Sequence, residues 1–201
     1  MGQQNMTGNP GLLGRLCHRL RRFGREEDGT ALLVEGMLLM PMLIWAAFGL
    51  YVYWDAFRTI NQVQKATYTA SDALSRMERN ASFTYVNGLS NAMTYLIQND
   101  FAPVMRYSSV IWVAARNRYE VQWSCSMNRS KMPPWTTTTL QTVATKLPIS
   151  DNAQTLILVE SSTNFRPALN IGLNDFVIRQ FVATKPRFVT QVGFNDVGNC
   201  N

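Results

Sequence analysis

The sequence predicts an α+β protein: a long N-terminal helix, membrane-spanning in its first half and amphipathic in its second, and a small exported domain of helices packed on an antiparallel sheet. The run 31–54 is apolar except for Glu35, and apolar residues then recur at spacings of three and four, which is typical of helices. Beyond residue 103 the period falls to two, which is typical of strands. Helices first and strands afterwards favour the α+β class.

The apolar run is long enough to cross a membrane. As a helix, residues 31–54 would extend about 36 Å, and a bilayer's hydrocarbon core is about 30 Å thick. A cleaved secretory signal is the alternative interpretation, but the apolar core of such signals has about 7–15 residues. The chain has 201 residues, 46% of them hydrophobic, and a net charge of +6, which suits one anchor and one domain.

The charges that flank the run predict its orientation. Five arginines precede it, whereas Asp55, Arg58 and Lys65 are the first charges after it. The positive-inside rule leaves the N-terminus in the cytoplasm and exports the chain after about Trp54. The arginines could also form a nucleic-acid-binding arm, but beside an apolar run they are explained by topology and by contact with anionic lipids. We therefore expect a membrane partner and no nucleic-acid partner.

Four segments follow from these observations. Residues 1–29 form a cytoplasmic basic segment, 30–54 the transmembrane helix, 55–80 its amphipathic continuation and 81–201 the exported domain. Asp28 or Thr30 can cap the helix, and acidic residues before it favour the positive end of its dipole. The continuation follows from one apolar stripe that runs to about Met77. The stripe consists of Ile60, Val63, Thr67, Ala70, Leu74 and Met77.

The exported domain divides into shorter elements. A second amphipathic helix is predicted at 85–99, before Pro103. A hairpin is predicted from 107–115 and 118–127, with its turn around Arg116 and Asn117. The segment 131–139 reads as a loop and 139–147 as a short helix. Strands are predicted at 154–165 and 175–185, with 187–194 as a candidate last strand.

The cysteines fit this topology. Cys17 lies on the predicted cytoplasmic side, where thiols stay reduced, whereas Cys125 and Cys200 are both exported and can oxidise. Cys125 ends the alternation of Tyr119, Val121 and Trp123 and is expected on the buried face of a strand. We predict a disulfide that pins the C-terminal tail to the sheet; two free thiols are the alternative.

The sequence offers no catalytic constellation. Its one histidine, His18, lies in the predicted cytoplasmic segment, so the exported part has no serine–histidine–aspartate or cysteine–histidine arrangement. Its carboxylates are scattered, and it has no glycine-rich phosphate loop. Aromatic residues and arginines in 110–123 could form a stacking groove for single-stranded nucleic acid, but such alternation is more often core and sheet surface. We expect a non-enzymatic protein without cofactor, metal or small-molecule substrate.

Two stretches resemble a known family. The sequence "EDGTALLVEGMLLMP", residues 27–41, is similar to the N-terminal region of TadE-like proteins, the minor pilins of the tight adherence (type IVc) pilus system. Residues 156–169 and 178–188 resemble the exported half of TadE-like and TadG-like proteins, with an aromatic–Arg–Pro after one strand and a Pro–Arg pair after the next. The resemblance implies a single-pass protein of the bacterial inner membrane with a periplasmic domain. Its partners would be other pilins and inner-membrane assembly proteins.

The resemblance also implies roles for individual residues. Gly29 and Thr30 are the candidate prepilin-peptidase site, Glu35 the candidate intramembrane pairing residue, and Pro41 a candidate helix kink. In cleaved pilins the glutamate usually stands fifth after the glycine, whereas Glu35 stands sixth.

Two forms of the protein therefore stay open. If the peptidase is a partner and cuts after Gly29, Glu35 would pair with the new amine of a neighbouring subunit. If the chain is uncleaved, Glu35 could reach the headgroups, meet a partner helix or be a tolerated interfacial carboxylate. A membrane-tethered binding or sensory domain and a peripheral enzyme are the rival functions.

Overall fold

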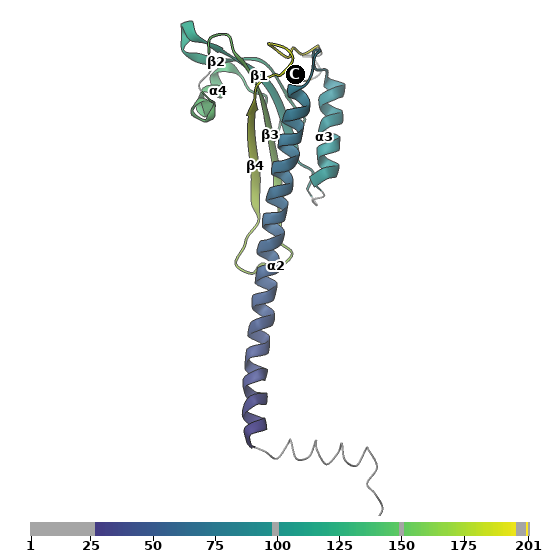
Figure 1. Cartoon of the computed structure of the whole chain (residues 1–201), viewed down its shortest axis with the longest axis vertical. Helices are drawn as coiled ribbons and strands as arrows, with labels where there is room; N and C mark the ends of the chain where they lie inside the picture. Colours follow the sequence, from purple (N-terminus) through teal and green to yellow (C-terminus); the bar gives the residue numbers. More distant parts are fainter. Residues whose placement is uncertain (1–26, 98–100, 149–150, 196–199, 201) are drawn as a thin grey trace, which may run out of the picture. The chain divides into compact units, whose positions relative to one another are not determined.

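The computed structural model describes the backbone of residues 27–97, 101–148, 151–195 and 200, and their side chains from residue 33 onward. The predicted α+β class is confirmed: helix α2 packs on a four-stranded antiparallel sheet in the order β2-β1-β3-β4 (Figure 1). The arginine-rich segment and Cys17 lie outside the described residues. The elements are α2 (Glu27–Ser75), α3 (Phe83–Ile97), β1 (Val104–Val113), η1 (Ala114–Arg116), β2 (Arg118–Ser126), α4 (Thr137–Leu140), η2 (Gln141–Lys146), β3 (Thr155–Phe165) and β4 (Phe176–Thr184).

The predicted stripe of α2 is the surface that packs on the sheet. The chain divides between Tyr51 and Val52 into two compact units, and the second contains the rest of α2 and every strand. Within it, the buried α2 side chains are small or β-branched and recur at helical spacing. They are Val52, Ala56, Thr59, Val63, Ala66, Thr67, Ala70, Ser71, Leu74 and Ser75. Because so many of them are alanine, serine or threonine, the helix backbone can lie close to the strands.

Two hydroxyl pairs join α2 to the sheet. Thr67 and Ser161 of β3 share a hydrogen bond of 2.7 Å, and Ser71 and Thr184 of β4 share one of 2.6 Å. The helix ends at Ser75, slightly before the predicted Met77, and the carbonyl of Ser75 accepts a hydrogen bond from the amide of Arg187 at 2.9 Å. This contact satisfies one of the carbonyls that a helix end leaves without an internal partner.

The predicted β1–β2 hairpin is confirmed, and the conformation of its turn explains the asparagine at position 117. Asn117 ends η1 with φ of 47°, a left-handed conformation that asparagine tolerates better than most residues. A bulge lies where Ser109 pairs with Trp123 but Val110 pairs with Val121. An extra residue on β2 shifts the alternation. Trp123 and Cys125 therefore face the α2 core, whereas Tyr119 belongs to a second core on the other face.

The second core is covered by the short α4–η2 segment, which confirms the predicted short helix and begins slightly earlier. The side chain of Thr136 accepts from the amide of Thr139, whose own side chain accepts from the amide of Thr136. This reciprocal capping box fixes the helix start. Leu140 and Leu147 of this segment are buried together with Leu158 of β3. The sheet thus has a core on each face.

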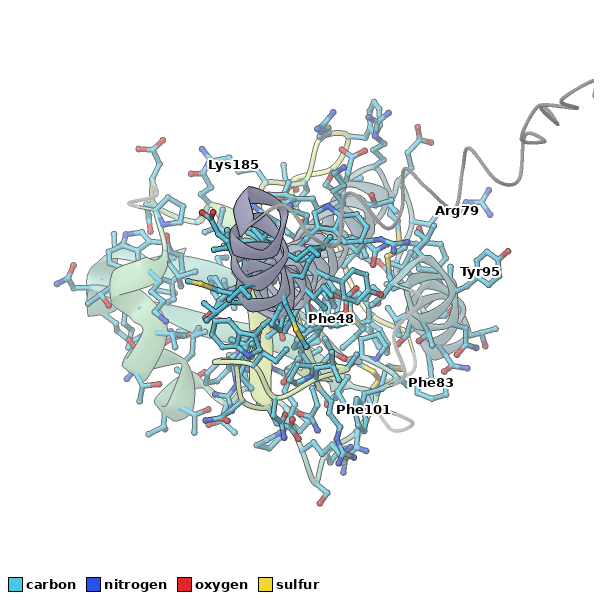
Figure 2. All side chains as sticks on the ribbon, turned by 90° about the horizontal axis from the view of Figure 1, so that it is seen from below. Phe48, Arg79, Phe83, Tyr95, Phe101 and Lys185 are labelled. Carbon is cyan, nitrogen blue, oxygen red and sulfur yellow. A yellow bond between two sulfur atoms is a disulfide. The ribbon has the colours of Figure 1, made fainter. Side chains whose placement is uncertain are left out.

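The helix α3 covers part of the α2 side with Val86, Met93 and Ile97, while Tyr95 projects away from the domain (Figure 2). The predicted candidate strand at 187–194 is wrong. In this segment, Phe194 alone makes an isolated bridge, to Ala81, and Val192 packs in the α2 core. The backbone carbonyl of Val192 accepts a hydrogen bond from Trp123 Nε1 at 2.8 Å, so the segment closes the core rather than extending the sheet.

Candidate functional site

The apolar half of α2 is the first candidate. The helix is long and apolar enough to cross a membrane by length and composition, and its most apolar stretch has no buried residue. Exposed large side chains follow one another from Leu33 to Tyr51, among them Trp45 and Phe48. A continuous exposed apolar surface of this length needs a cover of lipid or protein.

Glu35 is exposed within this apolar surface. Among the described residues it forms no hydrogen bond or ion pair, and none of them crowds the space that a Cβ on the neighbouring Gly36 would take. A carboxylate on a lipid-facing helix is costly and usually has a partner or a role. The position suits an interaction with another chain.

The remaining N-terminal candidates also lie in α2. Gly29 and Thr30 fall within the helix, but their side chains lie outside the described residues. Pro41 lies inside the helix, where its ring removes one backbone hydrogen bond. Its effect on the helix axis stays a prediction, as does peptidase cleavage.

The predicted disulfide is present. Cys125 on β2 and Cys200 are bonded, with Cα atoms 4.9 Å apart, and both side chains are buried in the α2 core. The guanidinium of Arg129 donates a hydrogen bond to the carbonyl of Cys200. The bond ties two positions 75 residues apart, so it anchors the end of the chain to the second strand.

A buried ion pair that the sequence pattern did not predict lies on the opposite face of the sheet. Arg106 of β1 and Glu160 of β3 are cross-strand partners, 7% and 6% exposed, and Arg106 Nε donates to Glu160 Oε2 at 2.6 Å. The Trp135 indole Nε1 donates to Glu160 Oε1 at 3.1 Å, and the Arg106 guanidinium lies 3.9 Å from the centre of a Trp135 ring. Pro133 offers its carbonyl to Arg106 as well.

Burial dominates the electrostatics of this pair. Desolvation raises the pKa of the Glu160 carboxyl, although Arg106, Trp135 and Lys146 each act to lower it. Desolvation likewise lowers the pKa of Arg106, against the attraction of Glu160. Each shift favours the neutral form because removing a charge from water costs free energy. In both shifts, desolvation therefore outweighs the attraction between the two charges.

The ion pair forms the floor of a pocket of about 350 Å³. Lys131, Lys146 and Arg179 stand around it with exposed side chains, and among the described residues none of the three forms an ion pair. Since Arg106 and Glu160 neutralise each other, the rim is positive. Within the described part of the chain, no three histidine, cysteine, aspartate or glutamate side chains gather as metal ligands would. The pocket is suited to hold an anionic group by charge.

No family model, no curated protein and no solved structure matches this chain. Its class is therefore defined by architecture: one N-terminal helix long and apolar enough to cross a membrane, and an α+β domain closed by a disulfide.

Proposed function

We propose that this chain is a non-enzymatic, single-pass protein of the bacterial inner membrane that acts as a minor pilin or assembly component of a tight adherence pilus. The observation that carries the proposal is the exposed apolar half of α2 with its single carboxylate, Glu35. The N-terminus is cytoplasmic and the disulfide-linked domain periplasmic, where cysteines can oxidise. Its partners are other pilins and inner-membrane assembly proteins, which the lipid-facing helix contacts directly.

The substitution Glu35→Gln tests this proposal. If Glu35 pairs with a cation in the membrane, the substitution leaves that cation unpaired, at a cost of about 3–5 kcal/mol. We expect the variant to insert and accumulate normally and to lose piliation, and Glu35→Asp to retain part of it. Met37→Leu, an apolar change in the same exposed surface, is the matched control. Wild-type piliation from Glu35→Gln at equal protein level would show that this carboxylate has no pairing role.

Topology is tested separately with a reporter that is active only outside the cytoplasm. A fusion at Asn201 should be active and a fusion at Gly24 silent, because five arginines precede the apolar run. The reverse pattern would exclude a periplasmic domain and with it the pilus proposal.

The basic pocket favours a second candidate function, a membrane-tethered binding or sensory domain. Its support is the set of three exposed cations around a structured floor. Deleting the gene and scoring surface pili separates the two functions: normal pili together with a lost response to an anionic ligand would favour the binding domain.

A further inference from the structure

The β3–β4 loop, residues 166–175, is held at the point where α2 enters the domain. Tyr53 donates a hydrogen bond from its hydroxyl to the carbonyl of Gly172 at 3.3 Å, and the loop lies beside α2 (Figure 1). Gly172 has φ of +73°, and a Cβ there would lie 3.3 Å from the Tyr53 hydroxyl oxygen. Glycine therefore permits both the turn and the close approach. Tyr53 stands two residues after Tyr51, the last residue of the first unit.

Apolar side chains are exposed at this end of the sheet. Leu169 in the loop is 43% exposed, and Val177 at the start of β4 is 47% exposed. Phe101, which precedes β1, is also exposed, and its carbonyl accepts a hydrogen bond from Thr163 of β3. Trp54, at the adjoining level of α2, is exposed as well. The exposed apolar residues thus come from three separate parts of the chain.

The opposite end of the sheet has a different character. The hairpin tip carries Arg116 and Arg118, which both pair with Glu120. Phe188 and Tyr85 are exposed near that end, but scattered exposed apolar residues are ordinary on a protein surface. At the loop end, by contrast, the charges of Arg166 and Asp175 lie 3.9 Å apart and offset each other.

We propose that the loop end of the domain lies against the lipid surface, with Leu169 in the headgroup layer. This inference rests on the proposed membrane span. The rise of an α-helix from Leu33 to Tyr53 is about 30 Å, which equals the thickness of a hydrocarbon core. Tyr53 and Trp54 therefore stand at the bilayer boundary, where tyrosine and tryptophan are enriched. The loop bound to Tyr53 reaches the same level. The apolar face of an interfacial helix enters lipid by about 5–10 Å, and we expect Leu169 to reach a similar depth.

Site-specific fluorescence in vesicles tests this contact. The full chain, with Cys17→Ser and the disulfide intact, receives one new cysteine at Leu169, at Ile44 in the apolar segment, or at Ala115 in the hairpin tip. Each cysteine carries a polarity-sensitive dye, in phosphatidylcholine–phosphatidylglycerol vesicles with quenchers attached high or low on the acyl chains. We expect blue-shifted emission at Leu169 and Ile44. The high quencher should act more strongly at Leu169, the low quencher at Ile44, and neither at Ala115.

The outcomes separate the two proposals. Quenching at Ile44 without quenching at Leu169 would overturn the lipid contact and leave the membrane span in place. A blue shift at Leu169 without quenching would also overturn it, because protein rather than lipid would then cover the loop. Absence of quenching at Ile44 would remove the span itself. A second variant, Leu169→Asp, should move a dye at Val177 toward water-like emission, whereas Tyr95→Asp on the outer side of α3 should not.

Discussion

Replacing the buried ion pair of β1 and β3 should make the domain more stable. Arg106 and Glu160 are both almost fully buried. Desolvation shifts the pKa of each residue in the direction that favours its neutral form. Replacing a buried ion pair by apolar residues of similar volume is often neutral or stabilising by about 1–4 kcal/mol. We therefore expect Arg106→Met with Glu160→Leu to range from wild-type stability to about 4 kcal/mol above it.

The single substitutions should behave differently from each other. Glu160→Leu leaves a buried guanidinium without its carboxylate, with the neutral carbonyl of Pro133 as a remaining acceptor. Because arginine cannot release its proton, we expect a loss of about 3–5 kcal/mol. Arg106→Met leaves a carboxyl that can take up a proton and still accept from Trp135. The loss of stability in Arg106→Met should therefore be smaller than in Glu160→Leu, and it should decrease as the pH falls.

Urea unfolding of the full chain in detergent, followed by tryptophan fluorescence, measures these differences. The exposed pair of Arg166 and Asp175 is the control, because removing a surface pair typically costs at most about 1 kcal/mol. A double variant as unstable as Glu160→Leu would refute the reasoning, since it would show that the pair contributes net stability.

Three further predictions concern the domain. The disulfide closes 75 residues, so replacing Cys125 and Cys200 by alanine should cost about 4.5 kcal/mol in the chain-entropy model, measured as a lower urea midpoint; an unchanged midpoint would contradict this. Burial raises the pKa of Glu160 above its unfolded value of about 4.3. The contribution of Glu160 to the free energy of unfolding is therefore fully present below about pH 4.3 and is lost as the pH rises through the folded pKa. The double variant should become more stable relative to the wild type over this window, and a difference in stability that stays constant with pH would contradict this prediction. Ala70→Leu should cost about 1–3 kcal/mol by overpacking the helix against the sheet, and Gln64→Leu on the exposed side of α2 should cost little in the same assay.

The long helix could be predicted from sequence because its signal is local. The apolar run and the stripe from Val63 to Leu74 repeat over a few residues, and burial in the structure follows the same spacing. The exact end could not be predicted in this way. It coincides with a hydrogen bond from Arg187, which is far along the chain from Ser75.

The wrong strand at 187–194 shows where periodicity is insufficient. Its alternating Phe188, Val192 and Phe194 resemble a strand, but alternation does not supply a partner. Here Gly193 and Asn195 exchange backbone hydrogen bonds with Ala81 in the connection between α2 and α3. The segment is therefore committed to closing the core.

The ion pair was missed because strand register is not local. Arg106 and Glu160 are 54 residues apart, and each appeared as one charge in an apolar strand. One opposite charge in the middle of each of two apolar strands was the signal that could have predicted the pair. Burying two such charges costs less free energy when the strands are neighbours and the charges lie opposite each other. The roles proposed for Gly29, Thr30, Glu35 and Pro41 stay predictions.

Two hydroxyl pairs and the hydrogen bond of Tyr53 with Gly172 hold α2 in its position along its own axis. A slide of the helix by one turn, about 5.4 Å, would bring each buried side chain of α2 close to the place of the residue four positions away. Because Thr67, Ser71 and Ser75 are spaced by four, a slide in one direction would bring Ser71 to Ser161 and Ser75 to Thr184, so the hydroxyl pairs alone do not fix the position. The same slide would put Phe57, which has no hydroxyl group, in the place of Tyr53 and would break the hydrogen bond to Gly172. The Tyr53 hydroxyl group is therefore what distinguishes the observed position of α2 on the sheet from the position one turn away.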